Sequence, residues 1–147
     1  MKMRLLLAFT LFLPNINWAQ DTPLFTCQIL NTDKKIEISQ DPENLIFTFG
    51  PAGAPELRVV EPKSSPLHKL WNGIGRTIWE GVGFENLGHI YELTTAIDTK
   101  DAVDNPTNIR IANLSVTKSG ETLATLSCDL NTVQYVSFAF EDAIFGQ

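Results

Sequence analysis

Residues 76–98 have the sequence RTIWEGVGFENLGHIYELTTAID, which predicts a β-hairpin of two long strands. In the second strand, residues 89–98, the side chains alternate with a period of two, so each face of the strand receives one set. The connecting residues 85–88 end in Gly88, which can adopt the positive φ that a tight hairpin loop needs. We expect Trp79, in the first strand, to lie in the core. This hairpin predicts an antiparallel sheet.

The same alternation recurs on both sides of the hairpin, in short segments separated by turn residues such as 31–33 (NTD) and 119–120 (SG). The further strands that we predict are residues 24–30, 34–39, 44–49, 56–61, 108–118, 121–129 and 133–140. We expect residues 62–75 to be irregular, with one helical turn at 67–71, and residues 99–107 to form an exposed loop. Together these elements predict an all-β fold, an antiparallel β-sandwich or small barrel of eight or nine strands.

The start of the chain has the layout of a secretory signal peptide. Two basic residues precede an apolar run at residues 5–13, and Ala19 offers a small residue at the cleavage point. The run is too short to span a bilayer, which takes about 20 apolar residues. We therefore predict a signal peptide at residues 1–19 and a single β domain at residues 20–147. We also expect no transmembrane segment after cleavage and a periplasmic or secreted location.

The charge balance limits the classes of partner. The chain has 17 acidic and 11 basic residues, which gives a net charge of −6 at pH 7. Removal of Lys2 and Arg4 with the signal peptide would bring the net charge to −8. Such an acidic chain lacks the basic face that binds nucleic acid. Its charge favours encounter with a basic protein partner.

Cys27 and Cys128 are the two cysteines of the chain. In an oxidising compartment their default state is a disulfide, and we predict one here. A lipid-modified Cys27 is the competing interpretation, but Phe25 and Thr26 are poor residues for a lipidation motif, and Cys128 would be left alone. The chain has no Cys-x-x-Cys motif of a redox pair. The disulfide would join the first strand to a late one and close a loop of about 100 residues.

The sequence contains no residue pattern that names a reaction. A zinc site would need His68 and His89 together with a carboxylate such as Glu85 or Glu92, and these residues lack ligand spacing. A Gly-x-Ser-x-Gly motif and a phosphate-binding glycine loop at the start of a helix are also missing. We therefore expect a protein that is not an enzyme and that uses no metal and no cofactor.

The most distinctive segment is residues 71–76, WNGIGR, which combines a tryptophan and an arginine with two glycines. Tryptophan and arginine are frequent interface anchors, and glycine lets a backbone approach another surface closely. The binding residues that we predict are Trp71, Asn72, Gly73, Gly75 and Arg76. The alternative interpretation is a tight bend that has only a structural role.

Two other loops are weaker candidates. Residues 50–55 contain two prolines and two glycines, so this loop is pre-ordered and could present backbone groups to a partner. A plain β-turn is the alternative, and we favour it. The acidic residues Asp98, Asp101 and Asp104 lack the glycine and the terminal glutamate of a calcium-binding EF-hand loop. We expect them to form a solvated loop.

The order of several features resembles that of short exported bacterial proteins of the β-sandwich or barrel type. These features are Cys27 in the first strand, KIEI at residues 35–38, FTFG at 47–50, WNGIGR at 71–76, and Cys128. More distantly, the chain is similar to periplasmic lysozyme inhibitors and to immunity proteins that neutralise wall-degrading effectors. The Ser-Gly-x-x-Tyr loop of the membrane-bound lysozyme inhibitors is absent. The resemblance implies a protein that binds and blocks another protein.

Export, acidity and the lack of a catalytic pattern favour the same function, an exported binding protein that occludes a protein partner. In this hypothesis a rigid loop around Trp71 and Arg76 fills the cleft of a basic, cell-wall-degrading enzyme, as an inhibitor or immunity protein would. The alternative function is a carrier of a small apolar ligand inside a barrel, which needs a cavity of roughly 300–1,000 Å³. A third class is an enzyme whose carboxylates meet only in space. The sequence leaves the oligomeric state open.

Overall fold

The structure is a computed structural model that describes residues 21–146, and the predicted signal peptide lies outside these residues. Two four-stranded antiparallel sheets form the body of the protein. Sheet 1 consists of β1 (Thr22–Gln28), β2 (Lys34–Gln40), β3 (Asn44–Pro51) and β4 (Leu57–Pro62). Sheet 2 consists of β5 (Thr77–Asn86), β6 (His89–Asp98), β7 (Ile111–Lys118) and β8 (Glu121–Ser127). The prediction of an all-β, antiparallel β-sandwich is confirmed, with eight strands among the described residues.

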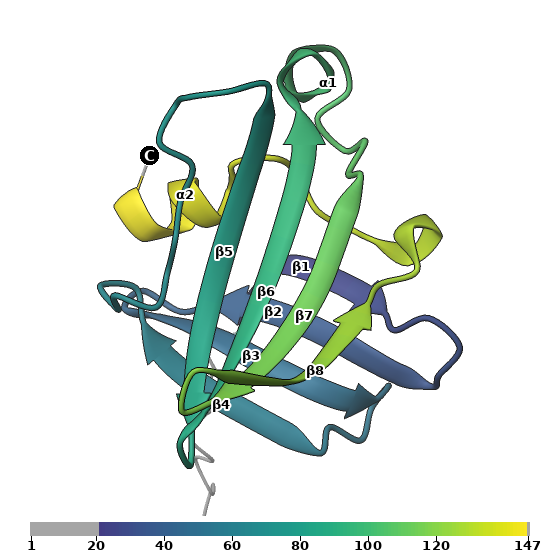
Figure 1. Ribbon diagram of the computed structural model, residues 1–147, viewed down its shortest axis with the longest axis vertical. Coiled ribbons are helices and arrows are strands. Elements are labelled where there is room, and N and C mark those ends of the chain that lie inside the picture. Colours follow the sequence, from purple (N-terminus) through teal and green to yellow (C-terminus); the bar gives the residue numbers. More distant parts are fainter. Residues whose placement is uncertain (1–20, 147) are drawn as a thin grey trace, which may run out of the picture.

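Each sheet is a meander, because its strands are neighbours in chain order. The hairpin of β5 and β6 pairs Thr77 with Asp98 at one end and Asn86 with His89 at the other. In Figure 1 the strands of sheet 1 run across those of sheet 2, so that the two sheets face each other over part of their length. Sheet 2 therefore extends beyond the cover that sheet 1 provides.

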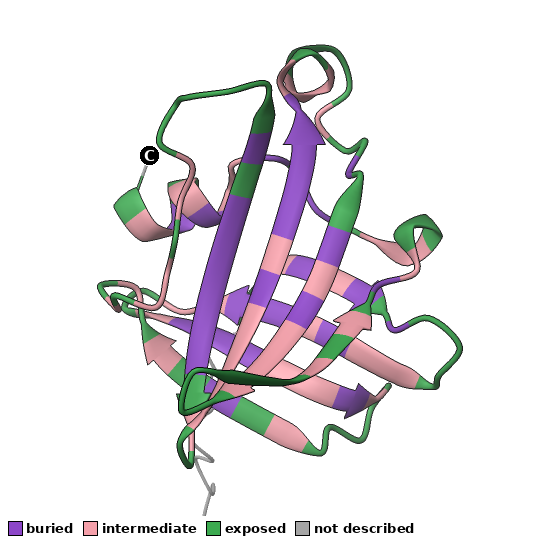
Figure 2. Cartoon of the chain, in the orientation of Figure 1, coloured by how far each residue is buried: buried purple, intermediate pink, exposed green. Residues whose placement is uncertain are grey.

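The inward-facing side chains of both sheets form the core, as the alternation predicts. Its fully buried members from the two sheets include Phe25, Ile36, Ile38, Leu45, Phe47, Val82, Phe84, Leu93 and Leu114. Phe47 of sheet 1 stacks on Phe84 of sheet 2 with their ring centroids 5.3 Å apart. Figure 2 shows this burial as purple bands along β5 and β6. Burial of each such side chain contributes about 1.5–3 kcal/mol to stability.

The C-terminal segment covers the part of sheet 2 that sheet 1 leaves open. It begins with a 3₁₀ turn, η1 (Leu130–Thr132), and ends in the helix α2 (Ala139–Phe145). Figure 1 shows it passing behind the upper parts of β5, β6 and β7. The predicted strand at residues 133–140 is wrong: Phe138 has φ 70° and ψ 4°, which ends any extended run and starts α2. Phe140 is nonetheless completely buried.

Two predictions for the connecting segments are also wrong. Residues 99–107 begin with a short helix, α1 (Thr99–Asp104), because the side chain of Asp98 accepts a hydrogen bond from the N–H of Lys100 and caps it. Residues 67–71 form no helical turn, because Lys69 instead pairs with Gly81 at the outer edge of β5 through two 2.7 Å hydrogen bonds. No helix within residues 21–146 is long and apolar enough to cross a membrane.

The predicted disulfide between Cys27 and Cys128 is present. Both cysteines are buried, and 101 residues of sequence separate them. The bond joins β1 of sheet 1 to the residue that directly follows β8 of sheet 2. Next to it, Ile29 and Cys128 form an isolated backbone bridge. The disulfide therefore closes nearly the whole domain into one loop.

Removal of this disulfide should strongly destabilise the protein. In the chain-entropy model a loop of about 100 residues is worth up to about 4.7 kcal/mol, through the entropy of the unfolded chain. We expect Cys27→Ala/Cys128→Ala to lower the free energy of unfolding by several kcal/mol in urea titrations, and reduction of the wild-type protein to give the same change. A loss below about 1 kcal/mol would contradict this prediction.

Candidate functional site

The five predicted binding residues lie together in the loop that enters β5. Residues 71–76 follow the Lys69–Gly81 bridge and reach the end of sheet 2 at which α1 also lies (Figure 1). The N–H of Thr99, the first residue of α1, donates a 2.8 Å hydrogen bond to the carbonyl of Arg76. The loop and the helix are therefore neighbours. We call residues 71–76 together with α1 the end surface.

Two hydrogen bonds inside the loop fix its shape. The indole Nε1 of Trp71 donates to the carbonyl of Ile74 at 2.9 Å. The N–H of Ile74 donates to the side-chain oxygen of Asn72 at 3.1 Å. Gly73 and Gly75 have φ of 82° and 97°, in the region that favours glycine. The loop is thus folded on itself, while the Trp71 ring packs against the core.

Arg76 connects the loop to the helix beside it. Its Nε donates to the Oδ2 atom of Asp98 at 2.7 Å, although the arginine side chain itself is mostly exposed. Asp98 is buried and also caps α1. The backbone N–H of Lys100, and then Arg76, hold the pKa of Asp98 below its usual range. The prediction that Asp98 belongs to a solvated acidic loop is therefore wrong. Asp101, from the same predicted loop, forms an ion pair with Arg110 at 2.7 Å.

The end surface exposes two apolar side chains that sequence reasoning missed. Ile74, at the tip of the loop, is 76% exposed, and Val103 of α1 is 84% exposed. Ile74 lies within the segment 71–76 but was not among its predicted binding residues, and Val103 lies in a segment that was expected to be a loop, so only their exposure on ordered segments distinguishes them. An exposed apolar side chain on a loop that hydrogen bonds already order can bind a partner with little loss of conformational entropy.

The expected core position of Trp79 is wrong. The even-numbered residues of β5 face inward, so Trp79 lies on the outer face and is 39% exposed. Gly81 and Gly83 share that outer face and are covered by the segment around Leu67 and Lys69. A Cβ at Gly83 would lie 2.8 Å from the carbonyl oxygen of Leu67. The two glycines therefore allow the segment around Leu67 and Lys69 to lie close against β5.

Because the even-numbered residues of β5 face inward, the carboxylate of Glu80 lies in the core, where the residue is 1% exposed. Its Oε2 accepts hydrogen bonds from the Tyr135 hydroxyl and, at 3.0 Å, from the N–H of Phe138. Its Oε1 accepts one from the N–H of Glu141 at 2.9 Å. Burial raises the pKa of Glu80 to about 7, against the lowering effect of the two backbone N–H groups. Sequence reasoning missed this residue, although a glutamate between Ile78 and Val82 on one strand face was a usable sign.

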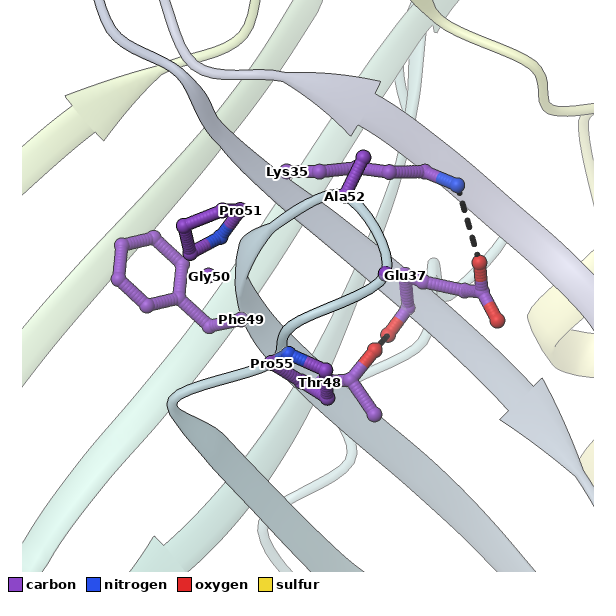
Figure 3. Close-up of a pocket in the computed structure, with 9 residues that line it drawn as sticks. Lys35, Glu37, Thr48, Phe49, Gly50, Pro51, Ala52 and Pro55 are labelled. Carbon is purple, nitrogen blue, oxygen red and sulfur yellow. Dashed lines mark hydrogen bonds and ion pairs between the residues drawn. The ribbon is translucent and has the colours of Figure 1, made fainter.

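The loop at residues 50–55 folds back over the outer face of sheet 1 (Figure 3). Gly50 allows this course, because a Cβ there would lie 2.5 Å from the N–H nitrogen of Glu56. A hollow of about 240 Å³ lies beneath the loop. Lys35 and Glu37 border it but bind each other at 3.1 Å. The hollow therefore presents no side chain that points to a particular ligand.

The two histidines serve different parts of the structure. His68 lies partly buried beside Phe84, where the N–H of Gly83 donates to its Nδ1 at 3.4 Å and its Nε2 lies 3.1 Å from the carbonyl of Pro62. Burial lowers the pKa of His68. His89 begins β6 beside Tyr91. Within residues 21–146, no three His, Cys, Asp or Glu side chains gather into a group that could hold a metal ion.

Comparison of the chain with protein-family models, curated proteins and solved structures gave no match.

The indole hydrogen bond predicts a measurable rigidity of the loop. Trp71→Phe keeps an aromatic ring against the core but removes the donor to Ile74, at a cost of about 0.5–1.5 kcal/mol. We expect the ¹⁵N order parameters of Gly73 and Ile74 to fall from about 0.85 to below about 0.6. Trp79→Phe, on the outer face of β5, is the control and should leave both values unchanged. Unaltered order parameters in Trp71→Phe would show that this bond does not fix the loop.

Proposed function

We propose that this chain is an exported binding protein that occludes a protein partner, and that the end surface makes the contact. The observation that carries the proposal is the combination of order and exposure at Ile74. Its carbonyl and N–H are both held by side chains of its own loop, yet its side chain is 76% exposed. An inhibitory loop needs this combination, because a segment that is already ordered loses little entropy when it binds.

The side chains at the end surface suit a protein cleft. Burial of Ile74 in an apolar pocket would contribute about 1.5–3 kcal/mol, and Val103 offers a second apolar contact on the neighbouring helix. Arg76 lies at the base of the loop with most of its side chain exposed. Its bond to Asp98 fixes the direction of the guanidinium group, which can form further hydrogen bonds to a partner.

The class of partner is inferred from charge and compartment. The predicted mature chain has a net charge of −8, which would accelerate its encounter with a basic protein. The disulfide supports a periplasmic or secreted location, since such bonds persist in oxidising compartments. We propose a basic cell-wall-degrading enzyme as the partner, which makes the chain an inhibitor or immunity protein. The order of sequence features that suggests a resemblance to lysozyme inhibitors and immunity proteins favours the same class, as a hypothesis that the comparisons leave untested.

The alternative function, a carrier of a small apolar ligand, is not supported by a specific observation. Phenylalanine side chains fill the interior, with Phe25, Phe47 and Phe84 on the sheets and Phe140 on α2, each with no exposed surface. Four hollows lined by described residues lie at the surface and open to solvent. We therefore do not propose the carrier function.

A panel of purified basic wall-degrading enzymes tests the proposal. The oxidised protein should inhibit at least one glycosidase, amidase or endopeptidase of the panel in a peptidoglycan-release assay. Ile74→Asp should weaken that inhibition at least tenfold, because it places a charge where an apolar contact forms. Val103→Asp should weaken it by a smaller factor.

Leu87→Asp is the matched control. Leu87 is 87% exposed and lies in the hairpin at the opposite end of β5, with a φ of 51° that aspartate accepts readily. This variant should inhibit as the wild type does. Lack of inhibition across the panel would remove the proposed partner class. Equal potency of Ile74→Asp and Leu87→Asp would remove the end surface as the contact.

A further inference from the structure

We propose that residues 135–145 form a strap that Glu80 holds closed over sheet 2, and that this strap opens as a unit, with the sheets intact, as the pH rises from mildly acidic to above neutral. This device is independent of the partner proposed above. It concerns a buried group for which the binding function has no use.

The strap begins where the C-terminal segment leaves β1. Gln134 and Thr26 exchange two backbone hydrogen bonds, of 3.0 and 2.9 Å, and so anchor the start of the strap. Beyond that point, the described backbone makes one hydrogen bond to a main-chain group of the body, from Ser137 N–H to Pro106 O at 3.1 Å. The remaining polar ties of residues 135–145 to the body are the three that end on Glu80. One carboxylate is therefore the principal polar fastening of the strap.

Apolar contacts keep the strap closed in the structure. Tyr135 and Phe140 pack with their ring centroids 4.9 Å apart, and each packs on Phe25 of β1, at 5.8 and 6.3 Å. Ala143 is also buried. This contact is small compared with the core between the sheets, so opening of the strap costs less free energy than global unfolding.

The charged groups that face Glu80 do not compensate its charge. Glu141 and Asp142 of α2 are both acidic and raise its pKa further. Its neighbour across the β5–β6 ladder is Thr95, and the side chain packed against the strap from β1 is Phe25, so neither contributes charge. Among the described residues no lysine or arginine forms an ion pair with Glu80. The ionised form therefore depends on hydrogen bonds alone.

The sign of the pH dependence follows from the two states of Glu80. In the closed state burial raises its pKa from 4.5 to about 7, whereas the opened strap would let water reach the carboxyl group and restore the ordinary value. The closed state then holds the proton more tightly. Closing is favoured most below pH 4.5, weakens as the pH rises through 7, and changes little above that. This shift changes the opening equilibrium by up to about 300-fold.

Protonation need not break the fastening. A protonated Glu80 can donate to the Tyr135 oxygen, while its remaining lone pairs still accept from the two backbone N–H groups. Ionisation keeps the same donors but buries an uncompensated charge. The strap therefore opens because the charged carboxylate gains hydration.

Native-state hydrogen exchange on the oxidised protein tests the strap. Protection factors for the N–H groups of Phe138, Glu141 and Asp142 are measured at pH 5 and pH 8, each in a series of low urea concentrations. Protection should fall by roughly 70-fold between the two pH values, because the carboxyl group of the opened state is already mostly ionised at pH 5. At pH 8 it should be lower than in the centre of β6 and depend less on urea, which marks a local opening. Equal protection and urea dependence in the strap and β6 would overturn the proposal.

Variants separate the role of Glu80 from general destabilisation. Glu80→Gln should abolish the pH dependence of strap protection. Tyr135→Phe should lower protection at both pH values and keep the dependence, since the titrating group remains. If Glu80→Gln does not fold, the proposal is tested instead by ¹³C NMR titration of the Glu80 carboxyl group in the wild-type protein. A midpoint near 7 supports the strap, and one near 4.5, or an unchanged pH dependence in folded Glu80→Gln, contradicts it.

Discussion

A carboxylate removed from water must find hydrogen-bond donors inside the protein, and Glu80 makes this requirement a constraint on the fold. It faces inward from β5 on the part of sheet 2 that the strap covers. The donors come from residues that lie 55 to 61 positions later in the chain. To bring the N–H groups of Phe138 and Glu141 to one carboxylate, the chain must turn there. The positive φ of Phe138 and the short helix α2 are the result.

The disulfide and the carboxylate act on successive parts of the C-terminal segment. Cys128 brings the chain to β1, and the segment then runs beside this strand as far as the Thr26–Gln134 pair. Beyond Gln134 the segment diverges from β1 towards Glu80, and an apolar hollow of about 330 Å³ opens between them. The edge of sheet 1 is thus covered without a fifth strand. The disulfide fixes the first part of the C-terminal segment, up to Gln134, whereas the position of the second part depends on Glu80, which can titrate.

The sequence predicted the parts of the fold that local periodicity controls. β6, which has alternating side chains and follows a turn that ends in glycine, was predicted with the correct bounds. The disulfide was also predicted correctly. Errors arose where a distant group overrides the local pattern. Residues 133–140 alternate like a strand, but the donors that Glu80 needs bend them into a helix. The expected core position of Trp79 is wrong because Ile78, Val82 and Phe84 direct the other face of β5 inward. The loop at 71–76 was recognisable from composition, but Ile74 at its tip was not.

β5 connects both proposals, since Arg76 precedes it and Glu80 lies within it. The described hydrogen bonds of the 71–76 loop stay within the loop or end on Asp98 and Thr99, and none ends on the strap. Opening of the strap would remove cover from the inner face of β5. The ladder to β6 and the bridge to Lys69 would still hold the strand on both edges. The loop at 71–76 should therefore keep its shape while the strap opens, so that a rigid contact loop and a titratable strap can be attached to the same strand.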